Sequence, residues 1–160
     1  GSNINPELNV REAIIRVRRI LGPLKVSTVY LTKPIPDNQP PYYNCVVEAE
    51  TALSPLSVKE VLRGIEDDMG RVRVSDKYAP RIIDLDLILY GNLIIRSSEL
   101  TLPDPEISSR PFLALPLLEL EPDLVIPGLN KAIRELARGI SGSDMKPLLD
   151  YTEELRRLAG

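Results

Sequence analysis

Residues 82–90 read IIDLDLILY, an apolar run that is interrupted by Asp84 and Asp86. A short apolar run of this length predicts a strand. Because side chains alternate between the two faces of a strand, we expect Asp84 and Asp86 to point to one face and the odd-numbered apolar residues 83–89 to the other. The stretch therefore predicts a largely buried strand that carries two carboxylates on the same side.

Helical and strand patterns precede this stretch. We expect, in order, a helix from Pro6 to Gly22, a strand over residues 24–32, a proline-rich loop over 33–41 and a second strand over 42–53. Ser57 and Glu60 form a capping box for a further helix, which ends at Gly70. A basic loop over residues 71–81 then leads into the central strand.

The pattern after residue 90 predicts one short strand and three helices. The strand is expected near residues 93–95 and the helices over about 111–120, 130–138 and 152–158. The predicted elements up to residue 90 follow the order helix, strand, strand, helix, strand. This order matches the last five elements of a βαββαβ unit, so the first strand of that unit is expected upstream of residue 1. The predicted fold class is α+β, with a ferredoxin-like βαββαβ core sheet and helices on both faces in αβα layers. We expect one domain over residues 1–160, with a C-terminal tail at 140–160.

The composition is typical of a globular protein with a mildly acidic balance. The 160 residues include 20 Lys+Arg and 23 Asp+Glu, a formal net charge of −3, and 43% are hydrophobic. General nucleic-acid binders carry a net basic footprint, so we expect no nucleic-acid partner. Neither a long apolar run nor a leader-like start is present, which predicts a cytoplasmic protein without membrane contact. We expect a monomer.

Several common catalytic groups are absent from the sequence. Histidine is missing, which excludes Ser-His-Asp triads, Cys-His dyads and HExxH metal sites. Cys45 is the only cysteine, which excludes an intrachain disulfide and a CxxC zinc site and indicates a reducing compartment. The nine glycines form neither a GxGxxG nor a GxxxxGK[ST] loop, so phosphate chemistry would depend on arginine, lysine and carboxylate-bound metal.

Four cations lie directly before the two aspartates. They are Arg71, Arg73, Lys77 and Arg81. Two ionised carboxylates on a buried strand are costly unless cations compensate, and divalent ions that also bind phosphate oxygens are one solution. Arginine suits a phosphate chain because its planar fork binds two oxygens at once. One interpretation is therefore a magnesium–nucleotide site. The other is a structural ion network of the same residues, and the aspartate pair alone favours neither.

The wider sequence resembles a known family. The run KYAPRIIDLDLI at 77–88 strongly resembles the signature of the 6-hydroxymethyl-7,8-dihydropterin pyrophosphokinase family of folate biosynthesis. Further motifs in the family's order extend the resemblance from residue 1 to about 128. They are GSN at 1–3, Tyr30, Thr32, QPPYYN at 39–44, Glu66, GRVR at 70–73, YGN at 90–92, LP at 102–103 and RPF at 110–112. The resemblance implies transfer of the β,γ-diphosphate of ATP to the pterin hydroxymethyl group, with release of AMP and with two Mg²⁺ ions.

The resemblance also implies roles for individual residues. The expected catalytic residues are Asp84 and Asp86, which match the family's metal-binding aspartates, and Arg71 and Arg81, which match its phosphate-contacting arginines. The expected ATP residues are Glu66, Arg71, Arg73, Lys77, Arg81, Arg110 and, near the adenine, Ile88. The expected pterin residues are Thr32, Pro34, Ile35, Tyr42, Asn44 and Phe112. Phe112, the one phenylalanine, matches a ring that stacks on the pterin; its alternative role is a core anchor of the helix that starts at Pro111.

Two positions depart from the family's pattern. Asp104 stands where the family usually has a nucleotide-contacting histidine, and Tyr78 stands where it often has tryptophan. A carboxylate cannot donate a hydrogen bond as imidazole does, and it would repel a phosphate placed close by. These changes bear on affinity and rate, because they leave the expected metal ligands and phosphate arginines in place.

Positioning and electrostatic stabilisation are the expected mechanism, with in-line attack of the hydroxymethyl oxygen on the β-phosphorus. The loops at 33–41 and 70–81 are expected to close over the substrates. Three alternatives stay open at this point: a non-catalytic ferredoxin-like binding module, a catalytically impaired paralogue that binds pterin and nucleotide, and an ordinary kinase that releases ADP.

Overall fold

The computed structural model describes residues 1–34 and 36–160, so the predicted pterin residue Ile35 lies outside the described residues. The helices within these ranges are α1 (Pro6–Leu21), α2 (Pro55–Asp68), α3 (Pro111–Leu120), α4 (Ile133–Arg138), α5 (Leu149–Ala159) and the 3₁₀ helix η1 (Pro105–Ser108). The strands are β1 (Leu24–Val26), β2 (Tyr30–Thr32), β3 (Tyr42–Asn44), β4 (Val47–Ala49), β5 (Ile95–Arg96), β6 (Thr101–Leu102), β7 (Val125–Ile126), β8 (Lys131–Ala132) and β9 (Lys146–Pro147). The predicted α+β class is confirmed.

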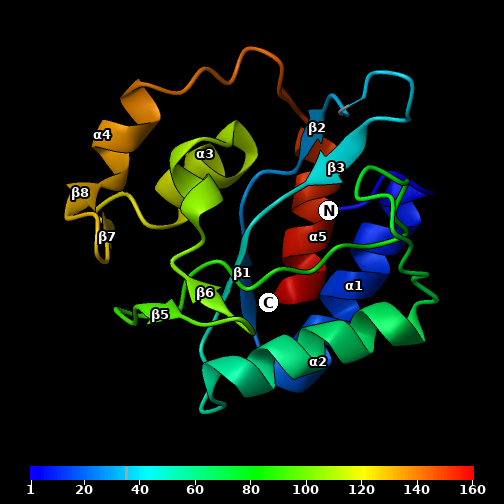
Figure 1. The fold of residues 1–160 in the computed structure, drawn as a ribbon. Helices are drawn as coiled ribbons and strands as arrows, with labels where there is room; N and C mark the ends of the chain where they lie inside the picture. The colour runs from blue at the N-terminus through cyan, green and yellow to red at the C-terminus, as the bar shows by residue number, and fades with distance from the viewer. Residues whose placement is uncertain (35) are drawn as a thin grey trace.

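Two groups of helices lie on either side of the strands β1 to β4 (Figure 1). One hydrophobic cluster joins α1, α2, α5 and β1, and its fully buried members include Val29, Ile83 and Leu155. A second cluster forms between α3, α4 and β7, around Ile107 and Ile133. The strands pair as small antiparallel sheets among the described residues, in the orders β1-β4, β3-β2-β9, β5-β6 and β7-β8.

The predicted strands over 24–32 and 42–53 are each divided in two. Val26 opposes Val47 and Tyr30 opposes Asn44, so residues 27–29 face residues 45 and 46 across the pair. One extra residue on one strand is the mark of a β-bulge, which interrupts the regular ladder and bends the strand. The predictions were therefore wrong in extent.

Side chains from distant helices bind the backbone of this bulge. The carboxylate of Glu119, in α3, accepts hydrogen bonds from the backbone N–H of Thr28 at 3.0 Å. The hydroxyl of Thr152, in α5, accepts one from the N–H of Val29 at 2.9 Å. These partners replace the ladder bonds that a regular strand would have made.

Replacing Thr152 by valine is expected to destabilise the protein. The Thr152 side chain is 1% exposed, and its hydroxyl accepts from Val29 and donates to the Leu148 carbonyl. An N–H left unpaired in the core costs about 1–3 kcal/mol, so the melting temperature should fall by roughly 3–10 °C. Thermal unfolding followed by circular dichroism checks this. Ser143→Ala, on the exposed surface, is the control, and an unchanged Thr152→Val protein would contradict the role given to the hydroxyl.

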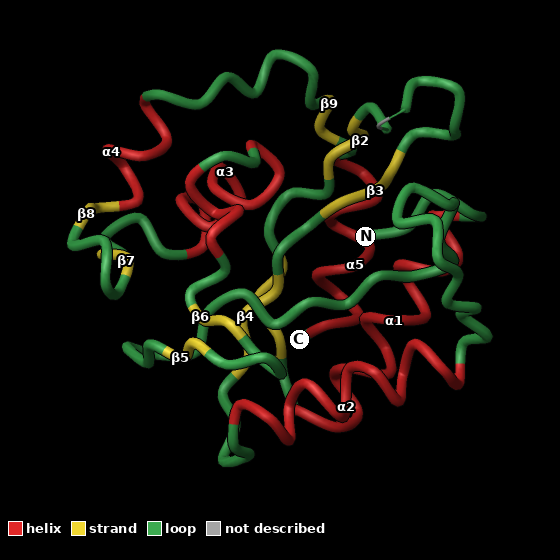
Figure 2. The backbone as a smooth tube through the Cα atoms, in the orientation of Figure 1, coloured by secondary structure: helices red, strands yellow, loops and turns green. Residues whose placement is uncertain are grey.

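Residues 82–90 do not form the predicted strand. They run through the molecule without regular strand pairing (Figure 2). The N–H of Leu85 donates to the Glu66 carboxylate at 3.0 Å, and the carbonyl of Ile88 accepts from the N–H of Asp104 at 2.8 Å. Because these partners lie outside any strand, a ladder is not formed. The predicted alternation of faces is retained in part, since Ile83, Leu85 and Leu87 pack against the first cluster and Ile88 against the second.

The N-terminal residues 1–3 lie between β3 and the start of this segment. Ser2 and Tyr43 exchange backbone hydrogen bonds of 3.1 and 2.8 Å, while Gly1 and Asp84 exchange bonds of 2.7 and 2.8 Å. The N–H of Asn3 donates to the Arg81 carbonyl at 3.2 Å. Residues 1–3 thus connect β3 to residues 81–84 through backbone hydrogen bonds.

Three helix boundaries differ from the prediction. The hydroxyl of Ser54, not Ser57, caps α2, by accepting from the Ser57 N–H at 3.2 Å. The helix expected from residue 130 starts at Ile133, because Lys131 and Ala132 pair with β7. The expected polar helix at 152–158 is longer and supplies core residues through α5. Among the described residues, no helix combines the length and apolar character needed to span a membrane.

Candidate active site

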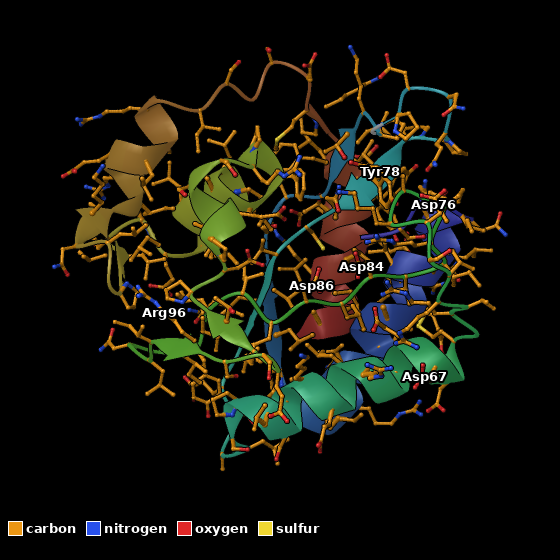
Figure 3. All side chains as sticks on the ribbon, in the orientation of Figure 1. Asp67, Asp76, Tyr78, Asp84, Asp86 and Arg96 are labelled. Atoms are coloured by element: carbon orange, nitrogen blue, oxygen red, sulfur yellow. The ribbon has the colours of Figure 1, made fainter. Side chains whose placement is uncertain are left out.

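Asp84 and Asp86 lie where two cavities meet. Residues 84–87 line both a cavity of about 360 Å³ and a larger one of about 1020 Å³. Figure 3 shows the two aspartates next to each other near the middle of the molecule, on the segment that follows the arginine-rich loop. We call residues 71–81 the arginine loop, and the two spaces the small and the large cavity.

Four parts of the chain build the small cavity. Helix α2, the arginine loop, residues 84–87 and residues 99–105 surround it. Its charged lining residues are Lys59, Arg63, Glu66, Arg71, Arg73, Asp84, Asp86, Glu99 and Asp104. The wall therefore offers both cations for phosphate and carboxylates for metal.

Glu66 holds the beginning of the arginine loop. Its side chain is 7% exposed, and its carboxylate accepts hydrogen bonds from Arg71, from Arg73 at 3.0 Å and from the N–H of Leu85 at 3.0 Å. A buried carboxylate is tolerated when cations and donors compensate its charge. Glu66 thus ties the arginine loop to the segment that carries the aspartates.

Asp84 is paired with two of the predicted phosphate arginines. Arg71 donates to its Oδ1 at 2.8 Å, and Arg81 donates to its Oδ2. Burial alone would raise the pKa of Asp84, but the positive charges around it, Arg81 and Arg71 among them, outweigh burial and lower that pKa below its usual range. The ion network of the alternative interpretation is thus present at Asp84, where it leaves a role in metal binding open.

Asp86 differs from Asp84 in its surroundings. No described cation lies within ion-pair distance of its carboxylate. Burial among neighbouring atoms, followed by repulsion from Asp84, raises the pKa of Asp86 to about 6, and Glu66 and Asp104 add to the increase. The carboxylate still faces solvent through the cavity. An uncompensated carboxylate at the junction of two cavities is suited to binding a cation.

The large cavity contains all the predicted pterin residues that the structure describes. They are Thr32, Pro34, Tyr42, Asn44 and Phe112. The amide of Asn44 donates to the Thr32 hydroxyl at 2.8 Å, which fixes two polar groups in the wall. Burial raises the pKa of Tyr42, so its hydroxyl stays protonated at neutral pH. Phe112 lines this cavity from the first turn of α3 and is half-buried, and its stacking on the pterin stays a prediction.

The predicted ATP residues divide between the two cavities. Glu66, Arg71 and Arg73 line the small cavity. Lys77, Arg81, Ile88 and Arg110 line the large one. Lys77 lies 4.9 Å from the ring centre of Tyr78, and Arg110 pairs with Glu106 at 3.4 Å. The side chain of Asp104 accepts from the Glu106 N–H at 2.9 Å and so caps η1.

Sequence reasoning missed part of the small cavity. Lys59 and Arg63 reach it from α2 and Thr101 from β6. A signal was present, since Lys59, Arg63 and Glu66 follow one another at i, i+4 and i+7 and therefore share one helix face. No comparable sequence pattern indicated Thr101.

The two aspartates offer only part of a metal's coordination shell. No described group of three or more His, Cys, Asp or Glu side chains could hold a metal ion. Mg²⁺ prefers oxygen ligands and usually keeps waters or substrate phosphates beside one or two carboxylates. The two aspartates therefore fit Mg²⁺ whose remaining ligands are phosphate oxygens and waters, rather than Mg²⁺ that is coordinated by protein side chains alone.

Comparisons with known proteins show to which family the chain belongs. The sequence model described as 7,8-dihydro-6-hydroxymethylpterin-pyrophosphokinase (HPPK) matches residues 1–122. The chain is 37% identical over 149 residues to 2-amino-4-hydroxy-6-hydroxymethyldihydropteridine pyrophosphokinase of Haemophilus influenzae, covering 91% of this chain and 92% of that protein. The Synechocystis protein of the same name is 35% identical over 151 residues, covering 92% and 77%. Folic acid synthesis protein fol1 of Pneumocystis carinii is 38% identical over 154 residues, covering 94% of this chain but 21% of that protein. The chain belongs to the 7,8-dihydro-6-hydroxymethylpterin pyrophosphokinase family.

Proposed function

We propose that this protein transfers the β,γ-diphosphate of ATP to 6-hydroxymethyl-7,8-dihydropterin, giving the pterin diphosphate and AMP in folate biosynthesis. The observation that carries the proposal beyond family membership is the position of Asp84 and Asp86 between two cavities. A transfer between two substrates needs one site for each, with the charge-neutralising groups at the junction.

The large cavity is proposed to hold the pterin. Its five described pterin residues combine two aromatic rings with the linked hydroxyl and amide of Thr32 and Asn44. Flat heterocycles bind well between aromatic faces, while a few fixed polar groups orient their edges. Tyr42 and Phe112 are proposed as the stacking rings.

The arginines and α2 are proposed to hold the triphosphate. Arg71 and Arg73 lie on the small-cavity side and Arg81 on the large-cavity side of the aspartates. Planar guanidinium groups on both sides of the junction can bind the phosphate oxygens that carry charge during transfer. Arg71 and Arg81 donate hydrogen bonds to the Asp84 carboxylate in this structure. When ATP binds, they would donate to its phosphate oxygens instead.

Asp84 and Asp86 are proposed to hold two Mg²⁺ ions together with the nucleotide. When bound, the ions would neutralise the charge of the triphosphate chain. The hydroxymethyl oxygen forms a bond to the β-phosphorus as the bond between that phosphorus and the α,β-bridging oxygen breaks. The bridging oxygen leaves on AMP, and the hydroxyl proton is released. The protein's part is to align the two substrates and exclude water.

A product assay tests this function against its alternatives. We expect AMP to form in step with the pterin diphosphate when the protein is mixed with ATP, Mg²⁺ and the pterin. ADP as the product would identify an ordinary kinase. Binding of both ligands without turnover would identify an impaired paralogue, and ligand affinity that is unaffected by Asp84→Ala or Asp86→Ala would identify a non-catalytic binding module.

Nucleotide binding with Mg²⁺ should weaken at acid pH through Asp86. A carboxylate must be ionised to bind Mg²⁺, and the pKa of Asp86 is about 6. Lowering the pH from about 7 to about 5 protonates most Asp86 side chains, so affinity for Mg²⁺ and α,β-methylene-ATP should fall roughly tenfold. Calorimetric titrations across this range measure it. The Asp86→Asn protein should bind Mg²⁺ and the nucleotide more weakly, and its remaining pH dependence should come only from titration of the nucleotide phosphates. Identical pH profiles for the original and variant proteins would contradict the assignment of Asp86 as a metal ligand.

Four further expectations remain proposals. We propose a ferredoxin-like arrangement, supported by the position of residues 1–3 between β3 and residues 81–84. A single domain over residues 1–160, a monomer and a cytoplasmic location, which the single cysteine Cys45 favours, are also proposed.

A further inference from the structure

Glu119 is the only polar side chain in the sequence of α3, which reads PFLALPLLEL. Its carboxylate accepts hydrogen bonds from the N–H and the hydroxyl of Thr28, each at 3.0 Å, and from the guanidinium of Arg156 at 2.8 Å. Thr28 lies in the bulge between β1 and β2, and Arg156 lies in α5. One carboxylate thus receives three donors from two other parts of the chain.

The Glu119 contact joins the two sides of the molecule. Helix α3 lies on one side of strands β1 to β4, and α5 lies on the other (Figure 1). On its own side, α3 packs against α4 and η1 through apolar side chains of the second cluster. Among the described residues, the Glu119 carboxylate makes the only hydrogen bonds that join α3 to the bulge or to α5. Apolar packing is non-directional, whereas hydrogen bonds to a carboxylate fix the position of the helix.

The other end of α3 carries Phe112, in the wall of the large cavity. Phe112 and Glu119 are seven residues apart, so they lie on the same face of the helix and are separated by roughly 10 Å along its axis. A further part of the cavity wall is formed by Thr32, Tyr42 and Asn44, on β2 and β3. Because β2 begins directly after the bulge, the Glu119 contact fixes the spacing between Phe112 and the residues on these strands.

Stacking on a flat ring is sensitive to such spacing. A gap of about 0.5–1 Å already forfeits roughly a quarter to a half of the attraction between two surfaces in contact. A displacement of this size at Phe112 would weaken the contact with a ring held between Phe112 and the strands. The position of α3 therefore bears on affinity for the ligand of the large cavity.

We propose that Glu119 is a positioning residue for the pterin, which holds α3 at the spacing from β2 and β3 that lets Phe112 stack on the ring. The inference rests on the proposed function, which assigns the large cavity to the pterin. Glu119 is not among the residues that line this cavity, so it acts through α3. Its loss is expected to weaken pterin binding about three- to tenfold.

The test measures two dissociation constants by calorimetry, that of Mg²⁺ with α,β-methylene-ATP and that of the pterin when this nucleotide is saturating. In Glu119→Ala the pterin constant should rise about three- to tenfold, while the nucleotide constant stays within about twofold. Glu153→Ala removes the other carboxylate that pairs with Arg156, at 2.7 Å, and should change neither constant. Thermal melts establish that the variants are folded. Glu119→Gln, which keeps the shape and loses the charge, should weaken pterin binding less than alanine does and serves if the alanine variant is unfolded.

A double substitution separates positioning from a general loss of structure. Phe112→Leu removes the stacking ring and keeps an apolar side chain. Because Glu119 is proposed to act through this ring, adding Glu119→Ala to Phe112→Leu should weaken pterin binding by less than about twofold. The effects of the two substitutions should therefore not be additive.

Three outcomes overturn the inference and leave the proposed pterin site intact. They are pterin affinity that is unchanged in Glu119→Gln and in any folded Glu119→Ala protein, equal weakening of nucleotide and pterin binding, and a full additive effect of Glu119→Ala in the Phe112→Leu protein. The second outcome would show a merely structural role, and the third would show that Glu119 does not act through Phe112. An original protein that binds no pterin would overturn the proposed function as well.

Discussion

Asp86→Asn is expected to abolish pyrophosphoryl transfer in a protein that is no less stable. Asp86 lacks an ion pair among the described residues and has its pKa raised to about 6, so ionisation of its carboxylate at neutral pH opposes folding, although only weakly because the residue is exposed to solvent. Asparagine keeps the shape and removes the charge. We expect kcat/KM to fall by about 10²- to 10³-fold or more, while the melting temperature without nucleotide rises by roughly 1–3 °C.

Asp84→Asn is the matched comparison, with a similar loss of activity and the opposite effect on stability. The pKa of Asp84 is lowered, so its ionised form stabilises the folded protein above the unfolded pKa, and this contribution is lost as pH falls through the folded pKa. Asparagine removes the charge that Arg71 and Arg81 bind. At neutral pH the melting temperature should fall by roughly 3–8 °C.

Thermal melts and initial rates of both variants, measured side by side, check this pair of predictions. Equal shifts of melting temperature would contradict the different electrostatic surroundings of the two carboxylates. Activity that survives Asp86→Asn would contradict its assignment as a metal ligand.

Arg81→Ala is expected to reduce the rate strongly without unfolding the protein. Arg81 is the arginine that both pairs with Asp84 and lines the large cavity, next to the proposed position of the transferred phosphates. Removing a cation that stabilises charge in the transition state costs about 10²–10³-fold in kcat. Steady-state rates at saturating ATP and pterin measure the effect.

Two variants sharpen this second prediction. Arg81→Lys keeps a positive charge but loses the planar fork, so it should recover only part of the rate. Arg134→Ala removes an arginine from an exposed ion pair with Asp123, and should stay within about twofold of the original rate. An Arg81→Ala enzyme with the original kcat would show that Arg81 serves only the ion pair with Asp84.

The elements that the sequence predicted well are those that depend on local pattern. Apolar residues at helical spacing predicted α1, and Pro111 at the start of an apolar run predicted α3. The charged residues around Asp84 predicted a site on the segment that lies between the two cavities, and the resemblance to the pyrophosphokinases supplied its expected chemistry. Family membership is confirmed.

The elements that the sequence predicted poorly depend on distant partners. The bulge at Thr28 is fixed by Glu119, which lies 91 positions away along the chain. The strand expected over 82–90 is not formed, in part because Glu66 takes the N–H of Leu85. The C-terminal helix looked polar, yet Leu155 is fully buried against the first cluster. Periodicity within a short window contains no information on such contacts.

In the candidate site too, local sequence patterns were informative and contacts between distant residues were not predicted. Charged residues close to Asp84 in sequence were found, whereas Lys59 and Arg63 were missed although they line the same cavity. The amide of Asn3 was noticed only as part of a motif, because its partners Gln39 and Arg81 lie far away in the chain. A single sequence predicts which residue types can do the chemistry, but not which distant side chains hold them in place.

Positional labelling of ATP tests the central claim most directly. The protein is incubated with Mg²⁺, the pterin and ATP labelled at the α-, β- or γ-phosphorus in separate reactions, and the products are separated. The account predicts that β- and γ-label both move to the pterin in equal amounts while α-label remains in AMP. Transfer of γ-label alone, with β-label left in ADP, would contradict pyrophosphoryl transfer at Asp84 and Asp86.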